Sequence, residues 1–285
     1  MILHLFPKVR IHSWGGFGSQ LNALGLAYNL SNKLPKRRIE LIFRTGGEHK
    51  AIYELNDLKL NEFEVTFKKI EDRIIRDVSP LHNTNLNVVK KFIKLNLIKF
   101  GLYATCESKS EFDSIKPWVL VVRGSYNLLP TKEFISFLYK KLDYRVEKLS
   151  AGDVIVHYRL GDLMTLVTKS PINEEILFQQ LNSAMKSRSI KSCTILSSDP
   201  DYATLKFKGL KSSIDISSRY ATPMDVLKMG FASKVFLGTN SKISMWVVFV
   251  RINQGLKNNY LPASLKNIFL QSYEEHTISD YVTFY

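Results

Sequence analysis

Two glycine- and charge-bearing turns, about half a chain apart, constrain the fold of this chain more than any other feature. The first is WGGFGSQL at residues 14–21, and the second is VIVHYRLGDL at residues 154–163. Each turn comes where an apolar run that reads as a buried strand gives way to the next element. Open α/β sheets bind phosphorylated ligands at the carboxyl ends of their strands. The pattern therefore predicts two separate sheets that contribute to one ligand site.

Strands and helices alternate in both halves of the chain. Strands are predicted at residues 9–14, 39–43, 118–122, 153–158, 194–197 and 234–237. Helices are predicted from Ser19 onward, over 131–142 and 173–186, and from Thr222, an N-cap residue followed by proline. This order predicts an α/β protein with two doubly wound domains, residues 1–148 and 149–285, and a linker at 143–152.

Composition indicates an ordinary globular protein of 285 residues, 45% hydrophobic and 23% charged. Its apolar runs fall well short of the ~20 residues that span a bilayer. The first ten residues lack the basic start and long apolar region of a signal peptide, so we expect a cytoplasmic protein. Two cysteines fit a reducing compartment, and no Cys/His cluster has zinc spacing, so no metal is expected.

The formal net charge of +14 is the unusual part of the composition. Such a surface favours nucleic acid, acidic lipid or anionic glycolipid, although a lysine-rich genome would produce the same charge without a specific partner. Apolar residues at 89, 92, 93, 97 and 100 have helical spacing, and four lysines accompany them. That helix could lie on a membrane surface, or it could be an ordinary surface helix packed on its apolar face.

Three segments carry residue types suited to binding an anion. Arg159 directly follows an apolar strand, where a guanidinium can grip a diphosphate with two hydrogen bonds or form an ion pair with Asp162. The glycine turn at Gly16 and Gly18 opens a helix whose backbone N–H groups could face an anion or a sugar. Ser241 could cap a helix and present its N-terminal dipole to a phosphate, or the segment 225–246 could be a plain packing unit.

The ordered set of these motifs resembles the fucosyltransferase superfamily, and most closely the bacterial α-1,2-fucosyltransferases of glycosyltransferase family 11. The family motif GGLGNQ is similar to GGFGSQ at residues 15–20, and HxRRxD is similar to HYRLGD at residues 157–162. Further matches are RGSY at 123–126, a strand that ends in Ser-Asp at 198–199, Asp225, and TNSKISMW at 239–246. The order and spacing hold over about the first 250 residues.

The resemblance implies a GT-B architecture, in which two Rossmann-like domains face a cleft. It implies an inverting glycosyltransferase that needs no metal and no cofactor and takes its sugar, most simply L-fucose from GDP-fucose, from a nucleotide donor. The implied acceptor is a hydroxyl of a bacterial surface glycan, an O-antigen or capsule intermediate of lipopolysaccharide type on a lipid carrier. We therefore expect peripheral contact with the acidic inner face of the cytoplasmic membrane, and no nucleic acid.

Particular residues acquire expected roles from the resemblance. Arg159 matches the arginine that binds the donor pyrophosphate, and Asp162 is our candidate general base. The implied donor-binding residues are His157, Arg159, Asp225, Asn240, Ser241, Ser244, Gly16 and Gly18. The implied acceptor or cleft residues are Gln20 and Arg123.

Three departures from the family motifs bear on the donor. Leu160 stands where the family has a second arginine, Ser19 replaces an asparagine, and Met245 replaces a tryptophan. Three alternatives therefore stay open beside GDP-fucose transfer. They are a glycosyltransferase with a different nucleotide-sugar donor, a glycan-binding protein without catalysis, and a basic nucleic-acid-binding protein.

Overall fold

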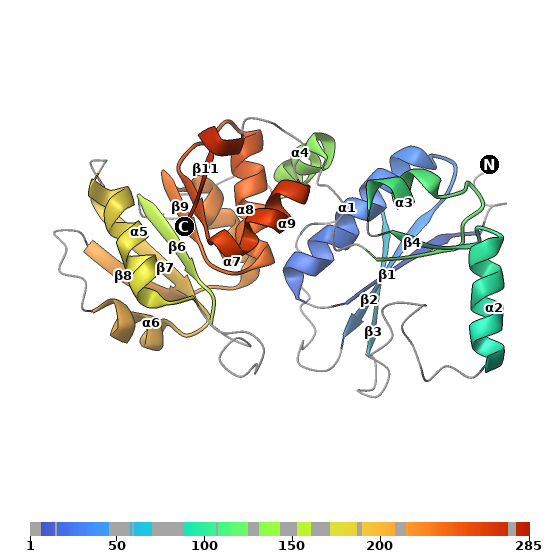
Figure 1. Ribbon diagram of the computed structural model, residues 1–285, viewed down its shortest axis with the longest axis horizontal. Coiled ribbons are helices and arrows are strands. Elements are labelled where there is room, and N and C mark those ends of the chain that lie inside the picture. The colour runs from blue at the N-terminus through green and yellow to red at the C-terminus, as the bar shows by residue number, and fades with distance from the viewer. Residues whose placement is uncertain are drawn as a thin grey trace. The chain divides into compact units, whose positions relative to one another are not determined.

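The structure is a computed structural model, and it describes residues 7–14, 16–45, 58, 60–69, 88–106, 108–124, 131–142, 153–160, 172–186, 190–208, 215–272 and 278–285. The chain divides into two compact units, Met1–Phe134 and Ile135–Tyr285. The predicted boundary between residues 148 and 149 and the predicted linker lie outside the described residues. Each unit is an α/β unit built on one parallel sheet (Figure 1).

The first unit carries a five-stranded sheet in the order β3-β2-β1-β5-β4. Its strands are β1 (Val9–Trp14), β2 (Ile39–Thr45), β3 (Glu64–Lys69), β4 (Tyr103–Cys106) and β5 (Val121–Gly124). Its helices are α1 (Phe17–Lys33), α2 (Val88–Lys99), α3 (Lys109–Ser114) and the start of α4 (Lys132–Lys141). Because β1 pairs with both β2 and β5, it is the central strand of this sheet.

The second unit carries a six-stranded sheet in the order β11-β10-β9-β6-β7-β8. Its strands are β6 (Val154–Tyr158), β7 (Ser192–Ser197), β8 (Asp215–Tyr220), β9 (Val235–Gly238), β10 (Asn259–Leu261) and β11 (Val282–Phe284). Its helices are α5 (Glu174–Lys186), α6 (Pro200–Phe207), α7 (Pro223–Ala232), α8 (Lys242–Asn253) and α9 (Lys266–Ser272). Numbered within the unit, this strand order is the 3-2-1-4-5-6 order of the Rossmann fold.

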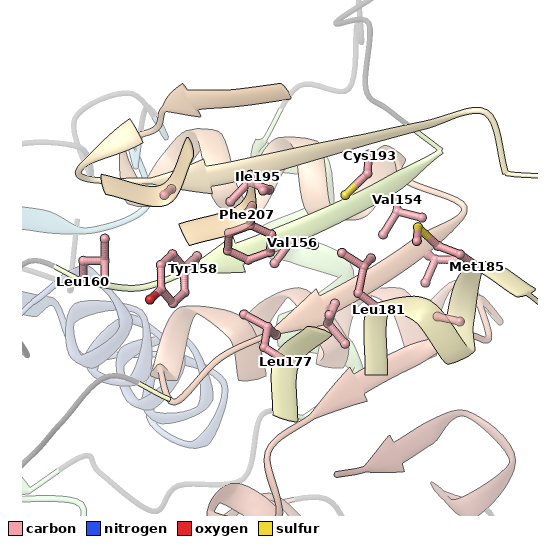
Figure 2. Close-up of a cluster of buried hydrophobic side chains, with 14 residues drawn as sticks. Val154, Val156, Tyr158, Leu160, Leu177, Leu181, Met185, Cys193, Ile195 and Phe207 are labelled. Carbon is pink, nitrogen blue, oxygen red and sulfur yellow. The ribbon is translucent and has the colours of Figure 1, made fainter. Parts of the chain in front are cut away.

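Alternation along β6 explains how both faces of this sheet are covered. Val154, Val156 and Tyr158 point to one face, where they pack with α5, α6 and neighbouring strands in a buried cluster (Figure 2). His157 points to the opposite face, where it meets α8. All five residues of β6 are buried, as expected of a central parallel strand.

Most of the predicted elements are confirmed, and one strand was placed wrongly. The predicted strand at 118–122 begins instead at Val121, because the preceding residues form a turn in which Val119 N donates to Lys116 O. Trp118, expected inside the strand, is 54% exposed. The predicted helix from Ser19 begins two residues earlier, at Phe17, with Gly16 as its N-cap.

No helix within the described ranges is long and apolar enough to cross a membrane.

A buried arginine fastens the amino edge of the second sheet. Arg251, on α8, is 1% exposed, and its guanidinium donates hydrogen bonds to backbone carbonyls at the end of α7 and before β9 and β10. Its Nε donates to the side-chain oxygen of Asn259, the first residue of β10. The charge is compensated by the carbonyl end of α7 and by these dipoles.

We expect Arg251→Met to lower the free energy of unfolding by about 3 kcal/mol, because several buried carbonyls would lose their donor together. Arg10→Met is the matched control, since Arg10 forms an exposed ion pair with Glu40 that contributes at most about 1 kcal/mol. Urea unfolding followed by circular dichroism measures both. Equal stability losses in the two variants would contradict this role for Arg251.

Candidate functional site

The second sheet has a topological switch point between β6 and β9. From β6 the chain continues to β7 and β8 on one side, and it returns to β9 on the other side. β6 and β9 are parallel neighbours, with His157 paired to Gly238, so their carboxyl ends lie side by side. Ligands of open α/β sheets bind in the crevice at such a point.

Thr239 joins the two strand ends at this switch point. Its hydroxyl donates to the carbonyl oxygen of His157 at 2.7 Å and accepts from the backbone N–H of Arg159 at 3.0 Å. The side chain is 1% exposed, so the link is shielded from water. Thr239 therefore fixes where the chain leaves β6 and where it turns into α8.

Arg159 and the N-terminus of α8 come together beyond Thr239. The half-buried Arg159 side chain extends over the turn that starts α8, and its Nη1 lies 3.5 Å from the carbonyl oxygen of Asn240. Ser241 caps this helix, because its hydroxyl accepts from Ile243 N at 3.2 Å. A guanidinium and a helix N-terminus at one place form a site suited to an anion such as a diphosphate.

His157 and Ser244 join the end of β6 to the first turn of α8. His157 Nδ1 and Ser244 Oγ lie 2.8 Å apart, and both side chains are buried. Burial, and then the nearby charge of Arg159, lower the pKa of His157 to about 3, so the imidazole is neutral near pH 7. The positive charge at this position therefore belongs to Arg159.

Gly238 allows α8 to approach β9 closely. A Cβ at this position would lie 2.6 Å from the Cβ of Ser244 and 2.9 Å from a methyl group of Leu261. The hydroxyl of Tyr285 donates to the carbonyl of Gly238 at 2.7 Å, which adds a second restraint on this strand end. The pairing of glycine with serine here keeps the helix N-terminus against the sheet.

Asp225 lies at another position, at the N-terminus of α7 beyond the carboxyl end of β8. It forms a capping box with Thr222, in which Asp225 Oδ2 accepts from the backbone and the hydroxyl of Thr222 at 2.9 Å. The structure thus gives Asp225 a role in starting α7. Its expected contact with a nucleotide stays a prediction.

The first unit has its own switch point, between β1 and β5. The glycine turn follows β1, and Arg123 lies near the end of β5. An ideal Cβ at Gly16 would meet nothing within 4 Å, so packing alone does not require glycine at this position. Gly18 and Gln20 are buried in α1, and the half-buried Arg123 guanidinium lies over the ring of Tyr103, 5.9 Å from its centre.

Two residues of the 157–162 motif have different outcomes. Asp162, the candidate base, lies outside the described residues. Leu160, which replaces the second arginine of the family motif, is 1% exposed and belongs to the cluster shown in Figure 2. The side chain at 160 therefore serves packing, and any second cation for a diphosphate would come from another position.

Sequence reasoning missed Thr239 and Tyr285 as residues that shape the site. Thr239 lies within a motif that was noted, but its link to β6 depends on strand pairing. Tyr285 is 47 residues from its partner Gly238, and no local pattern connects the two.

This chain is similar to known proteins in its fold and not in its sequence. No protein-family model matches the chain, and no curated protein sequence is significantly similar to it. Among solved structures, the glycosyl transferase family 9 protein from Veillonella parvula superposes with a TM-score of 0.51 at 10% identity, covering 100% of this chain and 87% of that one. This likeness confirms the predicted fold class, an α/β protein with two Rossmann-like units as in GT-B glycosyltransferases.

Two fucosyltransferase structures have lower scores. POFUT1 in complex with GDP has a TM-score of 0.46 at 15% identity, covering 90% of this chain and 98% of that one. NodZ α-1,6-fucosyltransferase soaked with GDP-fucose has a TM-score of 0.47 at 12% identity, covering 85% of this chain and 92% of that one.

Replacing Thr239 by valine keeps the shape of the side chain and removes both of its hydrogen bonds. We expect the free energy of unfolding to fall by about 2 kcal/mol, because His157 O and Arg159 N would lose a buried partner. Thr239→Ser is the matched control, since it keeps the hydroxyl. Urea unfolding of both variants measures the effect, and similar losses for serine and valine would mean that the methyl group matters more than the hydroxyl.

The pKa of His157 makes stability depend on pH. The pKa is about 3 in the folded protein, against about 6.5 for the unfolded chain. Between these values the unfolded chain binds a proton that the folded protein does not bind, so lowering the pH below about 6.5 favours unfolding. The slope from this one group approaches 1.4 kcal/mol per pH unit.

His157→Gln removes this titration and leaves the other histidines unchanged. We expect its free energy of unfolding to fall less steeply than that of the wild type between about pH 6 and pH 5. Urea titrations at a series of pH values measure the two slopes. Parallel slopes would mean that His157 is protonated in the folded protein.

Proposed function

We propose that this protein is a glycosyltransferase that uses a nucleoside diphosphate sugar. One observation carries the proposal: Arg159 and the capped N-terminus of α8 lie together at the switch point between β6 and β9. Two sources of positive charge at that place suit the diphosphate of such a donor. The GT-B-like fold is compatible with this reaction.

The chemistry gives each group a task. The oxygen of an acceptor hydroxyl forms a bond to the anomeric carbon, and the bond from that carbon to the diphosphate oxygen breaks. The diphosphate leaves with the electron pair, and the hydroxyl proton passes to a general base. Arg159 and the α8 N-terminus stabilise the charge that grows on the leaving group, so they act more strongly in the transition state than in the ground state. Asp162 is the proposed base.

The finer assignment follows the family resemblance of the sequence. We propose GDP-fucose as donor, transfer with inversion, membership of family 11, and no requirement for a metal or another cofactor. His157, Asp225, Asn240, Ser241 and Ser244 would line or support the donor site. The buried Leu160 leaves a single arginine in the 157–162 motif, and this favours testing other nucleotides beside GDP.

We propose that the first predicted domain, residues 1–148, binds the acceptor and that the second predicted domain, residues 149–285, holds the donor. Gly16 and Gly18 would contact the donor from the glycine turn, and Gln20 and Arg123 would line the cleft. The proposed acceptor is a lipid-linked O-antigen or capsule intermediate at the inner face of the cytoplasmic membrane. The net charge of +14 supports an anionic partner of this kind.

A thermal-shift screen tests the donor site. We expect a higher melting temperature with GDP and GDP-fucose than with UDP, CMP or dTDP compounds, unchanged by EDTA, because ligands of the folded state stabilise it. Arg159→Ala should weaken nucleotide affinity about 10- to 100-fold, the value of charge-assisted hydrogen bonds lost at a phosphate. Arg10→Ala, an exposed arginine of β1, is the control and should keep full affinity.

The outcomes separate the parts of the proposal. A shift with a nucleotide other than GDP would retain the enzyme class and replace the donor. No shift with any nucleotide sugar, or full affinity in folded Arg159→Ala protein, would reject the donor site. Product analysis with the shifting donor and a lipid-linked glycan then tests transfer itself.

A further inference from the structure

Helix α2 presents an apolar face to solvent. Among the described residues, eleven large apolar side chains are exposed, and five of them lie on or beside this one helix. We call these five residues the α2 face: Phe92 (67% exposed), Ile93 (53%), Leu95 (46%), Phe100 (65%) and Trp118 (54%). A gathering of large exposed apolar side chains is typical of a place where another surface docks.

The geometry of the helix explains how this face forms. At 3.6 residues per turn, Phe92, Ile93, Leu95 and Phe100 fall within less than half of the helix circumference. The half-buried Leu97 and Ile98 lie on the remaining side, and α2 contacts β4, the edge strand of the sheet. The helix therefore packs on one side, and among its apolar side chains that the structure describes, Phe92, Ile93 and Leu95 are exposed to solvent.

The end of α2 is held firmly, and Trp118 is attached to it. Leu102 N donates to Leu97 O and Gly101 N donates to Ile98 O, which is a Schellman motif with Gly101 at φ 69°. The indole N–H of Trp118 donates to the carbonyl oxygen of Phe100 at 2.8 Å. Because its only polar atom is used in this bond, Trp118 extends the exposed apolar surface beyond the helix.

The sequence around the α2 face is rich in positive charge. Residues 88–106 contain four lysines and no acidic residue, and Lys99 and Lys116 are exposed. The nearby acidic residues Glu111 and Asp113 are on α3, which is joined to α1 by hydrogen bonds from Lys33. Connections between parallel strands are right-handed as a rule, and for this strand order the rule places α1 and α3 on one face of the sheet and α2 on the other. We therefore expect these acids to lie away from the α2 face.

We propose that the α2 face binds the surface of an anionic phospholipid bilayer. Exposed Trp and Phe side chains enter the interfacial region of a membrane, and lysines beside them attract acidic headgroups. A protein partner would need no such combination of exposed aromatic rings with an acid-free lysine helix. The proposal rests on the proposed function in one respect, because it would hold a glycosyltransferase at the membrane that carries its lipid-linked acceptor.

Sedimentation of the full chain with vesicles tests this proposal. We expect binding to vesicles of equal parts phosphatidylcholine and phosphatidylglycerol, weaker binding as salt increases, and little binding to phosphatidylcholine alone. Phe92→Ser should lower the partition coefficient about tenfold, because burial of the aromatic ring is lost. Leu205→Ser is the matched control, since Leu205 is 69% exposed on α6 in the other unit. It should bind like the wild type.

A second variant separates the roles of charge and apolar area. Lys99→Gln should reduce binding to the acidic vesicles and flatten its salt dependence. Wild-type protein that stays in the supernatant with acidic vesicles, or Phe92→Ser protein that binds as well as the wild type, would overturn the proposal. So would a concentration-dependent dimer abolished by Phe92→Ser, because the face would then bind a second copy.

The two proposals fail separately. Phe92→Ser should keep the full nucleotide-induced thermal shift, and Arg159→Ala should keep full vesicle binding. Loss of vesicle binding with an intact nucleotide shift rejects only the membrane surface. Vesicle binding without any nucleotide shift rejects only the donor site.

Discussion

In each unit, one buried arginine ties together the amino ends of neighbouring strands, and the arrangement of the sheet depends on it. Arg37 is 9% exposed and donates to the carbonyls of Pro7, Pro117 and Val119, so it ties the start of β2 to the residues before β1 and β5. Arg251 does the same for β9 and β10 in the other unit. A guanidinium that donates to several backbone carbonyls at once is held rigidly, because releasing one bond leaves a buried polar group unpaired. These hydrogen bonds hold the amino ends of the strands together. The candidate functional residues lie at the opposite, carboxyl ends.

At the carboxyl edges, electrostatics and close packing act together. In the second unit Gly238 lets α8 approach β9, and Thr239 locks the turn to the end of β6. The helix N-terminus therefore stays where Arg159 can share an anion with it. Because burial keeps His157 neutral, the imidazole supports the turn without adding charge. In the first unit the corresponding place carries the glycine turn, which has free space at Gly16.

Particular residues show which parts of this arrangement were predictable. Thr222, Pro223 and Asp225 form a capping signature that acts through adjacent residues, and the structure confirms the helix they predict. The strand predicted at 118–122 was wrong at its start, because an apolar run alone does not distinguish a strand from an exposed turn held by Trp118 and Phe100. Helix α2 was predicted with both orientations open, since the spacing of apolar residues does not say which side a neighbour covers.

The sequence by itself determined the α/β class, the alternation of elements in both halves, and the caps Thr222 and Ser241 of two helices, because these depend on contacts within a few residues along the chain. Tertiary structure decided which strand ends meet. Only the pairing of β6 with β9 joins Thr239 to His157 and Arg159, 80 or more residues apart. Tertiary structure also decided that the side chain of Leu160 is buried in the core and that the α2 face is exposed to solvent. Burial is a property of the neighbours that surround a side chain, and the chain brings those neighbours together only when it folds.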